Sequence, residues 1–232
     1  IIYTKYGSTD QLREEEIAKP VLGKNEVLIK IHAASINSWD WDLLKGKPFL
    51  VRLLGGLSKP KHQVLGADIA GIVESVGPDV KSLQPGDAVF GDIAGSGFGG
   101  FAEYATASEK LLAKIPVGMS MEQAACLPQA GLLALQGLRY KKPLTSGQQL
   151  LINGAGGAVG TLALQFAKYI GATVTCVDKE EKSDTLLSLG ADHFIDKIAP
   201  GVVSWLENAY SPADEKNPAQ NALTILAAGL SS

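Results

Sequence analysis

The chain has 232 residues, which is enough for one large domain or for two small ones with a core each. Its residues are 46% hydrophobic and its formal net charge is −3, without a polybasic stretch. A protein that binds nucleic acid or an anionic membrane normally carries a basic face. We therefore expect a globular protein with no nucleic-acid partner and no membrane association.

The two cysteines, Cys126 and Cys176, both lie in apolar segments of the sequence. Cysteines in apolar segments are expected to be buried and to form no disulfide. Free thiols are typical of a reducing compartment, so the cytoplasm is the expected location.

The first half of the chain predicts short strands separated by turns. Val27, Ile29 and Ile31 alternate with more polar neighbours, which predicts a half-buried strand. After it, 33–41 is expected to form a loop or a short helix capped by Ser or Asn, and 45–61 an irregular, partly mobile lobe. Together these features predict a compact β-rich unit over 1–119, with strands at 1–3, 26–33, 66–77, 88–91, 101–107 and 111–115.

A helix start marks the end of this unit. Ser120 and Gln123 have the spacing of a capping box, in which each side chain satisfies a backbone N–H of the other residue. An apolar helical pattern follows to about Leu138. We place the domain boundary between 119 and 120.

The second half begins with an apolar strand, a cluster of glycines and a helix. Glycines allow a sharp turn and a close approach of the backbone to a pyrophosphate, and the following helix offers free N–H groups to the anion. A corner rich in glycine that holds no ligand is the alternative interpretation. The strand spans 149–153, and the predicted cofactor-binding residues of the turn are Asn153, Gly154, Ala155, Gly156, Gly157, Ala158, Val159 and Gly160.

A second strand, 172–177, ends in Asp178, about 20 residues beyond the turn. A carboxylate at this point accepts hydrogen bonds from an adenosine ribose and repels a 2′-phosphate, which favours NAD. Lys179 and Lys182 could neutralise such a phosphate, so NADP stays open.

Seven motifs, in this order, give the chain a family resemblance. They are 34–40 (Ala-Ser-Ile-Asn-Ser-Trp-Asp), 65–77, 83–89, 100–104 (Gly-Phe-Ala-Glu-Tyr), 127–131 (Leu-Pro-Gln-Ala-Gly), the glycine turn and 190–196. With them the chain resembles the medium-chain dehydrogenase/reductase superfamily, most closely its zinc-free, quinone oxidoreductase-like branch. The resemblance implies an α/β protein: a β-rich GroES-like catalytic domain over 1–119, then over 120–196 the first half of a Rossmann domain with a parallel sheet.

The absence of a metal centre is a further expectation. Zinc-dependent relatives place a cysteine at the position of Asn37, and a histidine and a glutamate at those of Ala67 and Asp68. Zinc requires three or four thiolate, imidazole or carboxylate ligands, and Asp68 alone could serve. We therefore expect neither a catalytic nor a structural zinc.

The resemblance also implies an activity and residues for it. A zinc-free relative transfers a hydride from NAD(P)H to a quinone or a conjugated carbonyl, and a homodimer is compatible with the family. Asn37 and Asp40 would line the nicotinamide and substrate side, with loop capping as the equal alternative. Tyr104 could donate a proton, although a buried structural tyrosine is the alternative, and Gln129 would face the cofactor.

Residues 197–232 form an atypical tail that matches no part of the family pattern. Its sequence predicts a helix over 202–210, a turn over 211–218 and an apolar stretch over 222–230 that could supply a missing strand. A non-catalytic, truncated remnant or a dinucleotide-binding module is therefore the alternative function.

Overall fold

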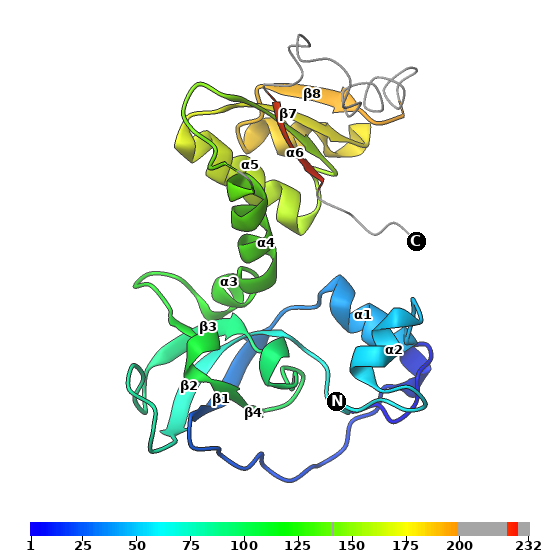
Figure 1. The fold of residues 1–232 in the computed structure, drawn as a ribbon, viewed down its shortest axis with the longest axis vertical. Helices are drawn as coiled ribbons and strands as arrows, with labels where there is room; N and C mark the ends of the chain where they lie inside the picture. Colours follow the sequence, from blue (N-terminus) through cyan, green and yellow to red (C-terminus); the bar gives the residue numbers. More distant parts are fainter. Residues whose placement is uncertain (141, 199–221, 227–232) are drawn as a thin grey trace. The chain divides into compact units, whose positions relative to one another are not determined.

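The computed structural model describes residues 1–140, 142–198 and 222–226. The chain divides into two compact units, Ile1–Gln129 and Ala130–Ser232, which are considered separately below. Figure 1 shows the first unit as a sheet with a helical lobe, and the second as a sheet with helices on it.

Unit 1 is built on a five-stranded antiparallel sheet in the order β4-β1-β2-β3-β5. Its core consists of aliphatic side chains from alternate positions, among them Val27, Ile29, Ile69 and Val89. This alternation confirms the half-buried strands expected of the first half. The strands are β1 (Glu26–Ala34), β2 (Asp68–Val76), β3 (Ala88–Asp92), β4 (Tyr104–Ser108) and β5 (Ala113–Lys114).

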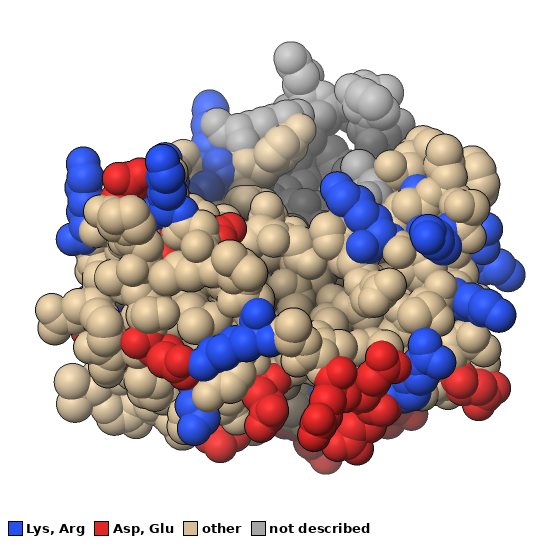
Figure 2. Space-filling view, turned by 90° about the horizontal axis from the view of Figure 1, so that it is seen from below, with Lys and Arg blue, Asp and Glu red and all other residues tan. Residues whose placement is uncertain are grey.

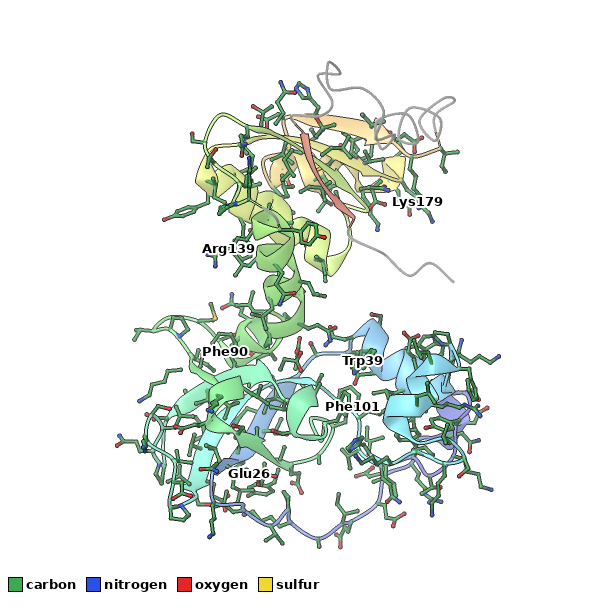
Figure 3. All side chains as sticks on the ribbon, in the orientation of Figure 1. Glu26, Trp39, Phe90, Phe101, Arg139 and Lys179 are labelled. Atoms are coloured by element: carbon green, nitrogen blue, oxygen red, sulfur yellow. The ribbon has the colours of Figure 1, made fainter. Side chains whose placement is uncertain are left out.

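A helical lobe accompanies this sheet. Helix α1 (Ser38–Lys45) begins after Asn37 and ends at Gly46, which adopts a left-handed conformation. Trp39 and Phe101, labelled in Figure 3, pack against the buried apolar cluster of this lobe. The expectation of an irregular segment over 45–61 was wrong in part, because Leu50–Gly55 forms helix α2.

The single helix predicted from 120 to about 138 is interrupted. The capping box of Ser120 and Gln123 is present and starts α3 (Met121–Ala125). Helix α4 (Pro128–Arg139) then starts anew at Pro128. Proline has no N–H and disfavours a helical residue before it, which explains the break at Leu127.

Two further expectations need correction. Residues 1–3 form no strand but a single bridge between Ile2 and Arg13. Cys176 is buried as expected, whereas Cys126 is exposed at the end of α3. Short 3-10 helices complete the described elements: η1 (Thr9–Gln11), η2 (Ala94–Ser96), η3 (Glu109–Leu111) and η4 (Glu180–Lys182).

Unit 2 has a parallel sheet in the order β8-β7-β6-β9. Its largest apolar cluster includes Leu150 and Ile152 from β6 and Ala163 and Leu164 from α5. Gly171 ends α5 in a left-handed conformation, as the sequence predicted. The elements are β6 (Gln149–Asn153), α5 (Ala158–Ile170), β7 (Thr173–Asp178), α6 (Ser183–Ser188) and β8 (His193–Asp196).

The fourth strand of this sheet comes from the tail. Strand β9 (Ala222–Leu226) pairs in parallel with β6, with Gln149 opposite Ala222 and Asn153 opposite Leu226. The part of the apolar stretch over 222–230 that the structure describes, Ala222–Leu226, thus supplies the strand that the sequence left open. The helix predicted over 202–210 and the turn over 211–218 lie outside the described residues.

Figure 2 shows acidic and basic side chains on the same face of the molecule, with the acidic ones densest toward the lower edge of the view. Within the described part of the chain, no helix combines the length and the apolar character needed to cross a bilayer.

Candidate dinucleotide and active-site residues

The glycine turn connects the end of β6 to the start of α5. Gly154 has a φ of 75°, and the N–H groups of Gly154 and Ala155 both donate to the carbonyl oxygen of Val177 in β7. Gly157 is the N-cap of α5 and supplies no side-chain cap. The first N–H groups of a helix have no partner within it, so those of α5 can bind an anion.

Gly160 lies where the turn and the helix pack most closely. A Cβ atom at this position would stand 2.6 Å from the Cα and carbonyl oxygen of Ala155 and from the carbonyl oxygen of Gly154. Backbone atoms cannot move aside as a flexible side chain can, so only glycine fits. This is the role that the third glycine of a dinucleotide-binding turn performs.

Asp178, at the end of β7, holds the turn from the other side. Its Oδ2 accepts from the N–H of Gly156 at 2.7 Å, and its Oδ1 accepts from the N–H of Lys179 at 2.8 Å. The Nζ atom of Lys182 lies 3.5 Å from Oδ1 and donates to the carbonyl oxygen of Gly156 at 3.3 Å. Both carboxylate oxygens are therefore already bound within the protein.

Burial alone would raise the pKa of Asp178. The hydrogen bonds from Lys179 and Gly156 and the charge of Lys182 outweigh it and hold this pKa below its usual range. The carboxylate is thus ionised at neutral pH, and the Lys182 ammonium partly neutralises it. Lys179, labelled in Figure 3, follows directly and is exposed.

The strand order gives a second indication of a binding site in unit 2. The chain proceeds from β6 to β7 and β8 on one side, and β9 then pairs with the other side of β6. In an open parallel sheet, ligands bind outside the carboxyl ends of the strands where the order reverses in this way. The glycine turn follows the carboxyl end of β6, at this reversal.

These residues fit a dinucleotide. The first N–H groups of α5 receive no side-chain cap from Gly157, and Gly160 allows the close backbone packing. Asp178, Lys179 and Lys182 lie together beside Gly156. The predicted residues of the turn are thus brought together in one place.

In unit 1, Asp40 is a buried residue of α1 with two backbone contacts. Its Oδ2 accepts from the N–H of Asn37 at 2.9 Å, and its Oδ1 accepts from the N–H of Gly66 at 2.8 Å. Burial raises the pKa of Asp40, against the effect of these two hydrogen bonds. Its contacts are those of loop capping, the alternative weighed for this residue.

Asp68, the first residue of β2, lies beside the same loop. Its Oδ2 accepts from the N–H of Gln129 at 3.0 Å, and its carbonyl oxygen accepts from the N–H of Ser35 at 3.1 Å. The Asn37 amide donates to Ser35 Oγ at 3.4 Å. The structure therefore connects Asn37 and Gln129 through Ser35 and Asp68. In the sequence, Asp68 stands out only as a possible metal ligand, and no local pattern indicates this connection.

Tyr104 lies apart from these residues. It starts β4 and stands opposite Lys30, whereas Asn37 follows the far end of β1. The ammonium of Lys19 lies 3.8 Å from the centroid of its ring and pairs with Glu74. Tyr104 is thus in contact with a surface ion pair and not with Asn37 or Asp40.

The described residues contain no group of three or more His, Cys, Asp and Glu side chains that could hold a metal ion. Asn37 and Ala67 offer neither a thiolate nor an imidazole at the positions where zinc-dependent relatives carry ligands.

Comparison with known proteins identifies the family of both units. The model of the alcohol dehydrogenase GroES-like domain matches residues 23–117, and that of the zinc-binding dehydrogenases matches 158–215. The chain belongs to the medium-chain dehydrogenase/reductase superfamily, in its quinone oxidoreductase-like branch. The fold is accordingly a GroES-like unit followed by part of a Rossmann domain.

Two plant enzymes illustrate the similarity. The chain is 40% identical over 203 residues to 2-methylene-furan-3-one reductase of Solanum lycopersicum, covering 84% of this chain and 50% of that protein. It is also 40% identical over 202 residues to quinone-oxidoreductase QR1, chloroplastic, of Triphysaria versicolor, covering 84% and 59%. The chain thus spans about half the length of the curated relatives that it matches.

Solved structures agree with this assignment. The quinone oxidoreductase of Coxiella burnetii has a TM-score of 0.75 and 34% identity, with 84% of this chain and 60% of that chain covered. The Escherichia coli quinone oxidoreductase complexed with NADPH has a TM-score of 0.76 and 27% identity, with 89% and 61% covered.

Proposed function

We propose that this protein is a zinc-independent, NAD(P)H-dependent oxidoreductase that reduces a quinone or a conjugated carbonyl. One observation carries the proposal: the glycine turn, held by Asp178, precedes an uncapped helix at the point where the strand order reverses. The relatives named as quinone oxidoreductases and as an alkenal/one oxidoreductase support the substrate class.

Each part of the chain then has a task. The N–H groups at the start of α5 bind the pyrophosphate, with Gly160 keeping the backbone close. In unit 1, Asn37 and Gln129 provide polar groups for the nicotinamide and substrate side. When bound, the reduced nicotinamide supplies the hydride, and the protein contributes orientation and the exclusion of water. The proton donor role of Tyr104 stays a prediction, and its contacts with Lys19 and Glu74 do not favour it.

For the cofactor, we infer that NADPH is accepted and preferred. The preference for NAD rested on Asp178 as a free ribose acceptor, but both its oxygens already accept from backbone N–H groups. Lys182 reduces the repulsion that this carboxylate would exert on a 2′-phosphate. The Escherichia coli quinone oxidoreductase, whose structure is a complex with NADPH, is consistent with this inference.

The experiment compares NADPH and NADH binding by fluorescence titration. Lys182→Gln should weaken NADPH binding about tenfold, the effect of one charge-assisted hydrogen bond, and change NADH binding about twofold or less. Lys142→Gln, which alters an exposed lysine preceding the amino end of β6, serves as the control. Equal losses for both dinucleotides would contradict the role of Lys182, and no binding by the unaltered protein would contradict the function.

A second measurement tests the absence of zinc. NADPH oxidation in the presence of a quinone should be unchanged by a chelator, because Asn37 and Ala67 cannot bind the metal. Stoichiometric zinc that is lost together with activity would contradict this. The cytoplasmic location and the homodimer stay predictions; some relatives are named as chloroplastic or mitochondrial.

The rival function is a dinucleotide-binding module without catalysis. It is favoured by the contacts of Asp40 and Tyr104, which are those of loop capping and of a surface ion pair. Binding of NADPH without its oxidation by any quinone or conjugated carbonyl would favour this alternative.

A further inference from the structure

Asp68 is a buried acid with one unpaired oxygen. The residue is 1% exposed, and its Oδ1 has no hydrogen-bond partner among the described residues. Leaving a buried acceptor unpaired costs free energy, so such an atom requires an explanation. A bound zinc ion does not explain the unpaired oxygen, because Asn37 and Ala67 provide neither a thiolate nor an imidazole as further ligands.

Its other polar atoms join two segments that are distant in sequence. Oδ2 accepts from the N–H of Gln129 at the start of α4, and the carbonyl oxygen accepts from the N–H of Ser35 before α1. Ser35 in turn accepts from the Asn37 amide. One residue of β2 therefore supports both places in unit 1 that we assign to the nicotinamide and substrate side.

The electrostatic environment of Asp68 favours its neutral form. Burial raises the pKa of Asp68 to about 6, against the hydrogen bond from the Gln129 N–H and the effect of the nearby Asn37 amide, which donates to Ser35 and leaves Oδ1 unpaired. The charges of Asp92 and Asp40 raise it further. Asp92 stands opposite Asp68 in the neighbouring strand β3, and Asp40 lies in α1. The charged groups that face Asp68 within the described residues are thus acids.

We propose that Asp68 is a positioning residue, which fixes the Asn37 loop and the first turn of α4 and carries an exchangeable proton on Oδ1. The proposal rests on the proposed function, which assigns these two segments to the nicotinamide and substrate side. In the neutral form, Oδ2 still accepts from Gln129 while Oδ1 becomes a donor, so the connection persists without a buried charge. An asparagine reproduces this neutral form, whereas an alanine removes the acceptor.

The test uses the complete chain with Asp68→Ala, Asp68→Asn and, as a matched control, Asp79→Asn. Asp79 is an exposed acid beyond the other end of β2. Hydrogen exchange of the Gln129 amide should be about tenfold faster or more in Asp68→Ala and within about threefold of the unaltered rate in the other two variants. In assays with NADPH, Asp68→Ala should lower kcat about tenfold and leave KM for NADPH within about twofold.

The pH profile separates positioning from a purely structural role. In the unaltered protein and in Asp79→Asn, kcat should fall as pH rises through about 6, because ionisation of Asp68 places a buried negative charge near Asp92 and Asp40. Asp68→Asn, which stays neutral, should lack this fall and keep the activity that Asp68→Ala loses. Unchanged exchange of Gln129 in Asp68→Ala would overturn the proposal, as would a fall that persists in Asp68→Asn. If Asp68→Ala does not fold, the pH profile of Asp68→Asn decides.

If no variant consumes NADPH, the proposed function fails. Two readouts that need no activity then still test the positioning role of Asp68. One is the exchange of the Gln129 amide. The other is unfolding: as pH rises from about 4 to 6, the unaltered protein should lose stability relative to Asp68→Asn, because a raised pKa means that the folded state binds more protons in this range. If the difference in the free energy of unfolding between the two proteins stays constant from about pH 4 to 6, the proposal is overturned.

Discussion

Cys126 and Cys176 show how similar sequence surroundings lead to different environments. Cys176 lies inside β7, where burial and the nearby charges of Asp178 and Asp192 raise the pKa of its thiol to about 11. Cys126 follows α3 and is exposed. Reactivity requires an accessible thiolate, so the two thiols differ in their chemistry.

We predict that iodoacetamide labels one cysteine of the folded protein within minutes and both cysteines after unfolding. Mass spectrometry of the intact chain counts the labels. Cys126→Ser should leave the folded protein unlabelled. Rapid double labelling of the folded chain would show that Cys176 is accessible.

At the level of single residues, the sequence identified the glycine turn and Asp178, because both follow from a local pattern of strand, glycines and helix. It did not reveal that Asp178 binds the turn itself, since the N–H direction of Gly156 depends on the folded backbone. The link from Asp68 to Gln129 joins residues 61 positions apart, and such a contact leaves no local pattern.

At the level of elements, Gly160 and Gly131 allow a direct comparison, because each lies in a helix. We predict that Gly160→Ala lowers the free energy of unfolding by about 1 to 3 kcal/mol, since its Cβ would collide with backbone atoms at 2.6 Å. At Gly131 a Cβ would meet nothing within 4 Å, so Gly131→Ala should be neutral or stabilise by about 0.5 to 1 kcal/mol. Denaturant unfolding measures both, and equal effects would contradict the role of Gly160.

The boundaries of elements were predicted well where apolar alternation or a cap marked them. Strand β6 begins and ends where the sequence placed it, and α1 starts after Asn37. The helix through 120–138 was predicted as continuous because its apolar pattern persists across Pro128, whose missing N–H breaks it. Helix α2 was missed because glycines and prolines flank its short apolar segment.

Strand β9 gives a prediction about the sheet of unit 2. A chain shortened after Ile198 should lose about 2 to 4 kcal/mol of stability and aggregate, because the backbone groups along one edge of β6 lose their partner. A chain shortened after Leu226 keeps this pairing and should resemble the full chain. Denaturant unfolding and light scattering compare the two, and equal stabilities would show that β9 adds nothing to the sheet.

At the level of the whole molecule, the share of the relatives' length that the chain spans sets an expectation for activity. We predict that these 232 residues, expressed alone, bind NADPH but have a kcat/KM about a hundredfold or more below that of the tomato reductase. A displacement of about 1 Å between reacting groups costs that much, and the nicotinamide side depends on few residues here. Parallel assays with NADPH and a common enone decide it, and comparable rates would contradict the prediction.

The contact between Tyr3 and Gln63 in unit 1 affects how the protein folds during its synthesis. Tyr3 is buried, and its N–H donates to the carbonyl oxygen of Gln63. Ribosomes add about 5 to 20 residues per second, so Tyr3 must wait roughly 3 to 12 seconds until its partner has been synthesised. During that interval the apolar segment around Tyr3 is open to chaperones and proteases. In unit 2, by contrast, β6, α5 and β7 are contiguous in sequence and can assemble as soon as they leave the ribosome.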